Sequence, residues 1–260
     1  MGIMLGILSA AGAFAQSARA PSIEEATQSE LNHLGDLFID ISYMSIGSGN
    51  VDGAVGSTNE AMYIAQLAGN VQLEARAKAH RDEYRAIGLL ATADAAAQKG
   101  DAQAAIALRS IGCMMLSGSE VPDPILAPIR VNTEAICSGI KSVTNFDAAT
   151  IEQMSRISLI LLVDANAYNR MQDPGVAIGN AMAALDIAQA IEKEDLSVRI
   201  RDLIFAYETV SMLATARIFK EEKSNVLASE KIRAKACKRI AEVSPELAPM
   251  FKEVRPQCST

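Results

Sequence analysis

The sequence predicts an all-α protein of about nine helices that stack as antiparallel hairpins. Half of the 260 residues are apolar but only 4% are aromatic, a composition that suits closely packed helices better than β-sheets. Helix start and stop signals recur at short intervals, and the apolar residues between them follow the three-and-four spacing of a buried helix face. The charged fraction of 21% and the lack of low-complexity segments exclude a disordered chain.

The first fifteen residues predict an export signal that is removed from the mature protein. An apolar run from Ile3 to Leu8 leads to Ala13-Phe14-Ala15, the small-x-small pattern that signal peptidases cleave, before Gln16. The run is shorter than the roughly 20 residues needed to span a bilayer. The alternative is an apolar first helix of a cytosolic domain. We expect a signal peptide over residues 1–15, one helical repeat-like domain over 16–260, and no transmembrane segment after cleavage.

Four helices are predicted in the first half of the chain. Ser22-Ile23-Glu24-Glu25 forms a capping box, in which the Ser and Glu side chains satisfy free amides of the first helical turn. Glycine followed by Asn or Asp at 49–50, 69–70 and 100–101 ends one helix and caps the next. Ser57–Glu60 offers an alternative, later start for the second helix. The expected helices cover residues 22–46, 51–68, 71–98 and 102–116.

Five further helices and one irregular connection are predicted in the rest of the chain. Residues 117–128 contain three prolines and form a candidate boundary between two halves, with Asp123-Pro124 typical of a helix start. Asp147 and Asp173-Pro174 are also typical of helix starts. The fifth helix is expected to reach about residue 142, the sixth and seventh to begin at 147 and 173, and the last two to cover 195–220 and 225–243.

The turns between helices resemble those of tetratricopeptide repeats. Ala54 follows Gly49-Asn50 and Ala105 follows Gly100-Asp101, so both turns share a Gly-[Asn/Asp]-x-x-x-Ala pattern. The resemblance implies a right-handed stack of helical hairpins over about residues 22–220, with small residues where paired helices cross. The motif alanines Ala54, Ala105 and Ala177 are 51 and then 72 residues apart, whereas the family repeats every ~34 residues. The implied positions are Phe38, Ile41, Gly49, Ala54 and Ala61 in the first unit, Leu89, Ala93, Gly100, Ala105 and Gly112 in the second, and Leu161, Ala165, Tyr168, Ala177 and Ala184 in the third.

The four cysteines predict two disulfides. An even number of cysteines in an exported chain favours paired thiols, because compartments outside the cytosol are oxidising. Of the three connectivities, we expect Cys113 with Cys137 and Cys237 with Cys258, since each pair is close in sequence and closes a short loop. The alternative is four separate buried thiols that act as small apolar side chains.

Few residues indicate catalysis or metal binding. The chain contains two histidines, too few for a multi-histidine metal site, and we predict no enzyme activity, no cofactor and no metal. His33, Asp36 and Asp40 share one helix face and are expected to form an exposed polar surface. Ser138-Gly139-Ile140-Lys141 matches the Ser-x-x-Lys motif of penicillin-recognising enzymes, but their two companion motifs do not occur.

One segment is basic on an otherwise acidic chain. Residues 217–239 contain eight Lys or Arg and three Glu, while the net charge of the whole chain is -7. Lys231, Lys235, Lys238 and Arg239 predict a patch for an anionic partner, such as peripheral contact with the surface of the cell envelope. The alternative is a solvated helix face. The acidic chain and the lack of aromatic residues among the basic ones of residues 231–239 argue against nucleic acid as a partner.

These features predict a periplasmic or secreted protein that binds and does not catalyse. Stacked hairpins form a curved surface that commonly recognises peptides or proteins. We therefore expect a scaffold that presents a groove to a protein or peptide partner in the cell envelope. The alternative is an all-α small-ligand carrier or enzyme with a pocket among the helices, for which Asp164, Tyr168 and Arg170 are the candidate polar residues.

Overall fold

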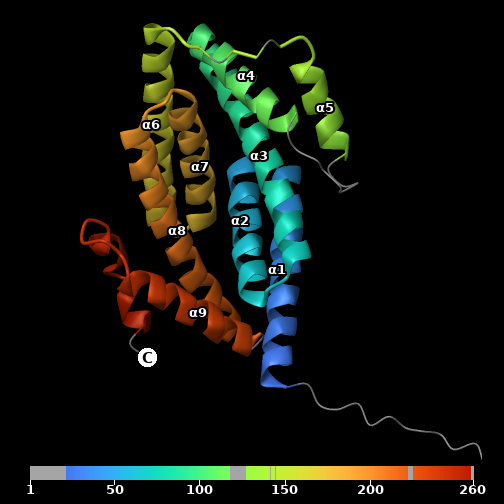
Figure 1. The fold of residues 1–260 in the computed structure, drawn as a ribbon, viewed down its shortest axis with the longest axis vertical. Helices are drawn as coiled ribbons and strands as arrows, with labels where there is room; N and C mark the ends of the chain where they lie inside the picture. The colour runs from blue at the N-terminus through green and yellow to red at the C-terminus, as the bar shows by residue number, and fades with distance from the viewer. Residues whose placement is uncertain (1–21, 118–126, 141, 144, 222–224, 259–260) are drawn as a thin grey trace, which may run out of the picture.

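The chain is all-helical wherever its structure is described, which confirms the predicted fold class (Figure 1). The structure is a computed structural model that describes residues 22–117, 127–140, 142–143, 145–221 and 225–258. The predicted signal peptide and the Asp123-Pro124 helix start lie outside these residues. The described helices are α1 (Ile23–Gly47), α2 (Val51–Ala68), α3 (Val71–Gln98), α4 (Ala102–Ser117), α5 (Ala127–Cys137), α6 (Ala148–Arg170), α7 (Pro174–Ala190), α8 (Glu194–Glu221) and α9 (Val226–Ala241), followed by two 3-10 turns, η1 (Ala248–Phe251) and η2 (Arg255–Cys258).

The predicted capping residues begin the helices. Ser22 and Glu25 form both hydrogen bonds of the capping box, with the Ser22 amide donating to Glu25 Oε2 at 2.7 Å. Asn50 accepts from the Gly53 amide at 2.9 Å, so α2 begins at Val51 and the later start at residues 57–60 is not used. Asp147 and Asp173 accept from amides of the first turns of α6 and α7 in the same way. Each of these caps satisfies an amide that would otherwise lack a partner.

The four helices α1–α4 and the four helices α6–α9 form two halves that repeat one arrangement. Their lengths are 25, 18, 28 and 16 residues in the first half and 23, 17, 28 and 16 in the second. Val51 and Pro174 begin equivalent helices 123 residues apart. At the same offset, residues 90–93 of α3 and 213–216 of α8 both read Leu-Ala-Thr-Ala. The two halves are therefore repeats of one another in sequence and in helix length.

The halves meet where α2 and α7 cross, at the centre of the molecule (Figure 1). Gly56 of α2 lies against the backbone of Gly175, and Gly179 of α7 lies against the backbone of Asp52. Positions 52 and 56 correspond to 175 and 179 in the repeat, so the two contacts are equivalent. In the repeat, α1 corresponds to α6 and α4 corresponds to α9. The contact of α1 with α9 is therefore equivalent to the contact of α4 with α6. Such reciprocal contacts define an approximate two-fold axis between the halves.

The central core draws on both halves. Ala54, Ala177 and the two tyrosines Tyr84 and Tyr207 are fully buried in one cluster. Ala54 and Ala177 are repeat equivalents, and so are Tyr84 and Tyr207. Small alanines at the helix crossing let the backbones approach closely, while the tyrosines fill the space beside them. Helical hairpins thus pack as predicted, and a right-handed repeat of the tetratricopeptide type stays a prediction.

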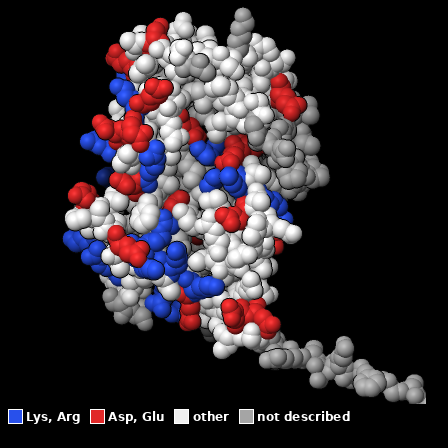
Figure 2. Space-filling model, in the orientation of Figure 1, with Lys and Arg blue, Asp and Glu red and all other residues white. Residues whose placement is uncertain are grey.

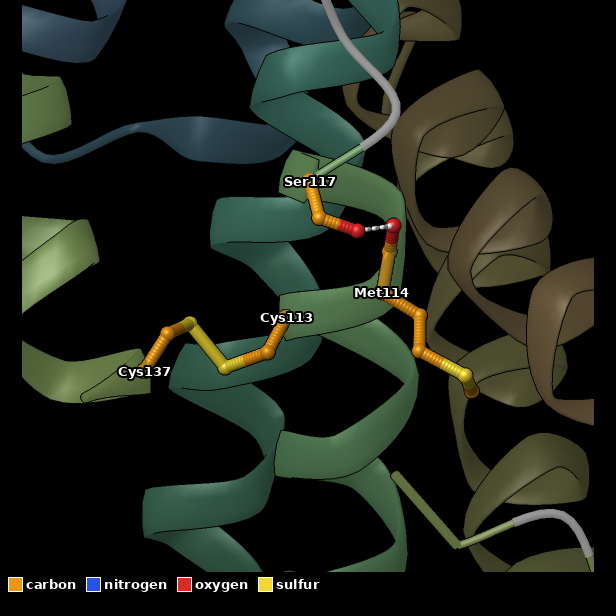
Figure 3. The surroundings of a disulfide bond; sticks show 4 residues. All are labelled: Cys113, Met114, Ser117 and Cys137. Atoms are coloured by element: carbon orange, nitrogen blue, oxygen red, sulfur yellow. Dashed lines mark hydrogen bonds between the residues drawn. A yellow bond between two sulfur atoms is a disulfide. The ribbon is translucent and has the colours of Figure 1, made fainter. Parts of the chain in front are cut away.

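Both predicted disulfides form, and they occupy equivalent places in the two halves. Cys113 of α4 bonds to Cys137 at the end of α5, with 5.5 Å between their Cα atoms (Figure 3). Cys237 of α9 bonds to Cys258 in η2, with 5.4 Å between Cα atoms. Each bond ties the fourth helix of its half to the segment that follows it. All four cysteines are therefore paired, and the alternative of separate thiols is wrong.

Several helix ends differ from the predicted ones by a few residues. The fifth helix ends at Cys137, several residues before the expected end near 142, because Gly139 adopts a positive φ of 86° that ends the helical hydrogen-bonding pattern. The ninth helix ends at Ala241 rather than at residue 243. No helix in the described ranges combines the length and hydropathy needed to cross a bilayer.

Candidate functional site

A cleft of about 300 Å³ opens where the two halves meet, on the face shown in Figure 2. Basic and acidic side chains gather around this hollow, between α8 and the α2–α3 hairpin. Two pairs of its lining residues are repeat equivalents, namely Arg81 with Ile204 and Arg85 with Glu208, so the cleft lies close to the approximate two-fold axis. The lining residues are Tyr63, Arg81, Arg85, Met182, Leu185, Arg201, Ile204, Phe205, Glu208 and Arg239.

The cleft lining is rich in arginine although the chain is acidic. Its lining contains four arginines and one glutamate, a net formal charge of +3, on a chain with a net charge of -7. The other carboxylates that pair with these arginines, on Asp82, Asp186 and Glu194, lie outside the lining. Each lining arginine therefore has a carboxylate partner, so the cleft gathers guanidinium donors without a large net charge around them.

Arg85 joins the first half to the second. Its Nε donates to Asp186 Oδ2 at 3.2 Å, its Nη2 donates to Asp186 Oδ1, and its Nη1 contacts Asp82 Oδ1 at 3.3 Å. Burial raises the pKa of Asp186, and Arg85 opposes that shift. The two-pronged geometry fixes the Arg85 guanidinium at the edge of the cleft.

Glu208 collects three donors at the other side of the cleft. Arg239 Nη2 donates to Glu208 Oε2 at 2.9 Å, Asn59 Nδ2 donates to Oε1 at 3.1 Å, and the Tyr63 hydroxyl donates to Oε2. Burial and the neighbouring Glu208 raise the pKa of Tyr63, so its hydroxyl stays protonated and donates. The Arg239 guanidinium lies 4.1 Å from the centre of the Phe205 ring, close enough for a cation–π contact. These contacts fix α2, α8 and α9 to one another.

A buried acid, Glu60, lies near this network. Its side chain is 2% exposed, and burial raises its pKa to about 7. Glu208 raises this pKa further, while Ser211, Thr215 and Arg239 lower it only in part. Glu60 therefore keeps its proton to a higher pH than an exposed glutamate does.

The predicted basic patch divides between two sides of α9. The three lysines, Lys231, Lys235 and Lys238, are exposed. Lys238 Nζ lies 3.9 Å from Glu242 Oε1. Arg239 does not belong with them, because it is 9% exposed and turns inward to Glu208. The three-and-four spacing that groups the lysines on one helix face places residue 239 next to the buried stripe.

The other predicted polar groups do not converge on a site. His33, Asp36 and Asp40 are exposed on α1, and Asp36 pairs with Arg76. No group of three or more His, Cys, Asp or Glu in the described part of the chain could hold a metal ion. Ser138 is exposed, and Lys141 lies outside the described residues.

The residues of the alternative enzyme or carrier site are also scattered. Asp164, Tyr168 and Arg170 are all exposed on α6. None of the three belongs to the lining of the cleft. Of the cleft arginines, Arg239 was predicted as part of the patch for an anionic partner, whereas Arg81, Arg85 and Arg201 were not predicted. Arg85 and Glu208 are nevertheless opposite charges at equivalent positions of the 123-residue repeat. This charge difference between equivalent positions is the sequence feature that could have indicated a site at the cleft.

Comparison with known protein families, curated proteins and solved structures finds no match to this chain. The inference of function therefore depends on the geometry of the cleft.

Proposed function

We propose that this chain is an exported, non-catalytic binding protein that presents the cleft to a peptide or protein partner in the cell envelope. The observation that carries the proposal is the open cleft in which Arg81, Arg85, Arg201 and Arg239 converge from α3, α8 and α9. Arginine donors are well suited to recognise carboxylates by paired hydrogen bonds. A partner that offers acidic groups is thus the best fit to this surface.

The chemistry of the lining supports binding over catalysis. Glu208 already accepts three hydrogen bonds, and the Tyr63 hydroxyl is engaged as one of its donors. A general base or nucleophile must be able to reach the substrate, whereas Glu208 is held in a nearly buried ion pair with Arg239. The remaining polar groups of the lining are guanidinium groups, which act as fixed cations.

Two features support export to the periplasm or the exterior. The two disulfides indicate an oxidising compartment. The motif Ala13-Phe14-Ala15 supports cleavage of a signal peptide before Gln16. The exposed ridge of Lys231, Lys235 and Lys238 would add peripheral contact with an anionic envelope surface.

Affinity purification from the envelope fraction tests the proposal. The bait is the full chain, compared with an Arg81→Gln, Arg201→Gln double variant and with a Lys231→Gln, Lys235→Gln control. A partner that co-purifies with the wild type and the lysine control, but is lost from the arginine variant, supports binding through the cleft. Identical sets of proteins from all three baits would contradict it.

A second candidate function is a carrier of a small anionic ligand. The cleft volume of about 300 Å³ favours it, because small-molecule sites begin near that size. Native mass spectrometry of the protein purified from its own compartment would detect such a ligand. A bound small molecule, with no protein partner recovered, would favour the carrier.

A further inference from the structure

The two sides of the cleft differ in chemistry although they derive from equivalent positions. Arg81 and Arg85 on α3 correspond to Ile204 and Glu208 on α8. The side formed by α3 therefore carries two guanidinium groups, whereas Ile204, Phe205, Met182 and Leu185 supply apolar surface on α7 and α8. A ligand that fills this cleft needs a charged end and an apolar end.

Two of the four arginines are already committed to the protein. Arg85 makes a two-pronged pair with Asp186, whose side chain is 6% exposed. Arg239 pairs with Glu208, and both side chains are at most 10% exposed. If either arginine left its buried carboxylate to bind a ligand, that carboxylate would become an unpaired buried charge. These two arginines therefore stay in place and define the shape and the electrostatic potential of the cleft.

The other two arginines have contacts that a ligand could replace. Arg201 is 47% exposed, and its ion pair in the described part of the chain is with Glu194, which is 74% exposed. A pair of this kind contributes little in water and exchanges easily. Arg81 Nη2 pairs with Asp82 Oδ1 at 3.2 Å, and Asp82 is 33% exposed and shared with Arg85, while Arg81 Nη1 contacts uncharged groups, Asn59 Oδ1 at 3.3 Å and Met62 Sδ at 3.2 Å. A carboxylate in the cleft would offer Arg81 Nη1 a charge-assisted hydrogen bond in place of its uncharged contacts, and it would compete with the exposed Glu194 for Arg201.

We propose that the cleft binds a carboxylate attached to an apolar body, with Arg201 and Arg81 holding the carboxylate and Phe205, Ile204, Met182 and Leu185 contacting the apolar part. This inference rests on the proposed binding function and names the chemistry that the cleft recognises. A singly charged head suits the cleft better than a phosphate, because Glu208 lies in the same lining and repels a second negative charge. The carboxylate can belong to a free organic acid or to the C-terminus of a peptide that ends in an apolar residue.

Titration calorimetry on the oxidised, mature protein tests this chemistry with defined probes. Octanoate and a peptide ending in Leu with a free C-terminus represent the two sources, and octanamide and the C-terminally amidated peptide are their uncharged controls. Octyl phosphate tests the identity of the head group. We expect the acids to bind about tenfold or more tightly than the matched amides, and octanoate more tightly than octyl phosphate.

Substitutions on α8 locate the site. Arg201→Gln should weaken binding of the acids by about tenfold, and Arg201→Lys by less, because it keeps the charge but loses the two-pronged geometry. Arg199→Gln is the matched control, since Arg199 is an exposed arginine on the same helix that lies outside the cleft lining. It should bind as the wild type does. Thermal midpoints measured first for each variant separate loss of binding from loss of folding.

The outcomes distinguish this inference from the function on which it rests. Binding of octanoate alone supports the carboxylate chemistry but overturns the peptide partner. Binding of both peptides regardless of amidation supports a peptide partner but overturns the carboxylate chemistry. Equal binding of acids and amides, tighter binding of octyl phosphate, unchanged binding by both Arg201 variants, or no binding of any probe would each overturn the inference.

Discussion

Glu60 is a buried acid whose pKa lies well above that of an exposed glutamate. It is enclosed among α2, α8 and α9, with Glu208 adding repulsion and Arg239 giving only partial compensation. Asp52 has a related environment at the crossing of α2 and α7, where burial raises its pKa to about 6 and Asn180 opposes the shift. Both acids hold protons more tightly in the folded chain than in the unfolded one.

This difference predicts that stability falls as the pH rises. The folded-state pKa of Glu60 is about 7 against an ordinary value of 4.5, so the folded protein binds more protons than the unfolded chain between these limits. Glu60→Gln removes the cost of ionisation. Relative to the wild type, the variant should gain about 2 kcal/mol more free energy of unfolding at pH 8 than at pH 5. Urea denaturation at the two pH values measures this gain.

The control for that experiment is Glu152→Gln, which changes an exposed glutamate on α6. Its effect on the free energy of unfolding should be small and equal at both pH values. If Glu60→Gln also gave the same change at pH 5 and pH 8, the ionisation of Glu60 would not contribute to the pH dependence.

Residue-scale prediction from sequence succeeds where the partner is local. The capping roles of Ser22 and Asp173 were predictable because each side chain bonds an amide three residues away. The ion pair of Arg85 with Asp186 was not predictable, because 101 residues separate them. A single sequence contains no spacing rule for contacts that depend on how two distant helices cross.

The crossing of α2 and α7 is the element-scale feature that joins the halves. A Cβ atom at Gly56 would overlap the backbone of Gly175, and one at Gly179 would overlap the backbone of Asp52. Backbone atoms cannot move aside as a flexible side chain can. Both glycines are therefore required by the close approach of the helices and not by their backbone angles.

Gly179→Ala should accordingly destabilise the protein by at least about 2 kcal/mol, because the added methyl group forces the two helices apart. Gly88→Ala is the control. It lies inside α3, where the nearest atom to a new Cβ is Val51 Cγ1 at an ordinary 3.5 Å. That variant should be neutral or up to about 1 kcal/mol more stable, since alanine is the better helix former. Thermal or urea unfolding measures both, and equal midpoints for the two variants would contradict the proposed crossing.

Helix positions were more predictable than helix partners. Each half keeps the order and approximate lengths predicted from caps and glycine breaks, because those signals act within one turn. The neighbour of α2 across the molecule depends instead on which small residues face each other. Gly56 and Gly179 share the pattern Ala-x-Gly at 54–56 and 177–179, but that pattern alone does not indicate that the two segments touch.

At the scale of the whole molecule, the repeat explains features that the tetratricopeptide resemblance left irregular. The motif alanines Ala54 and Ala177 are 123 residues apart, which is the offset between the halves. Ala105 belongs to a different helix pair within the first half. The sequence thus contains the longer period, in α2 with α7 and in α3 with α8, but a search at the family's ~34-residue period does not detect it.

Each half contains one disulfide at an equivalent place, so oxidation of the cysteines constrains both halves of the chain. They close loops with sequence separations of 24 and 21 residues, and each should stabilise the protein by about 3 kcal/mol through restriction of the unfolded chain. The second bond also holds a tail that Arg233 contacts through the Gln257 carbonyl at 3.3 Å. Unpaired terminal segments of this kind otherwise fray.

We therefore predict that export and stability are coupled. The chain expressed with residues 1–15 should be recovered outside the cytosol, begin at Gln16 and contain the Cys113–Cys137 and Cys237–Cys258 linked peptides. The same chain started at Gln16 in a reducing cytosol should lack both bonds and unfold at a lower temperature, because its unfolded state is less restricted, and oxidation after purification should restore the midpoint. N-terminal sequencing, non-reducing peptide mapping and calorimetry measure the three properties. An uncleaved chain that stays in the cytosol would remove the case for export, whereas equal midpoints for the reduced and oxidised forms would show that the disulfides do not stabilise the fold.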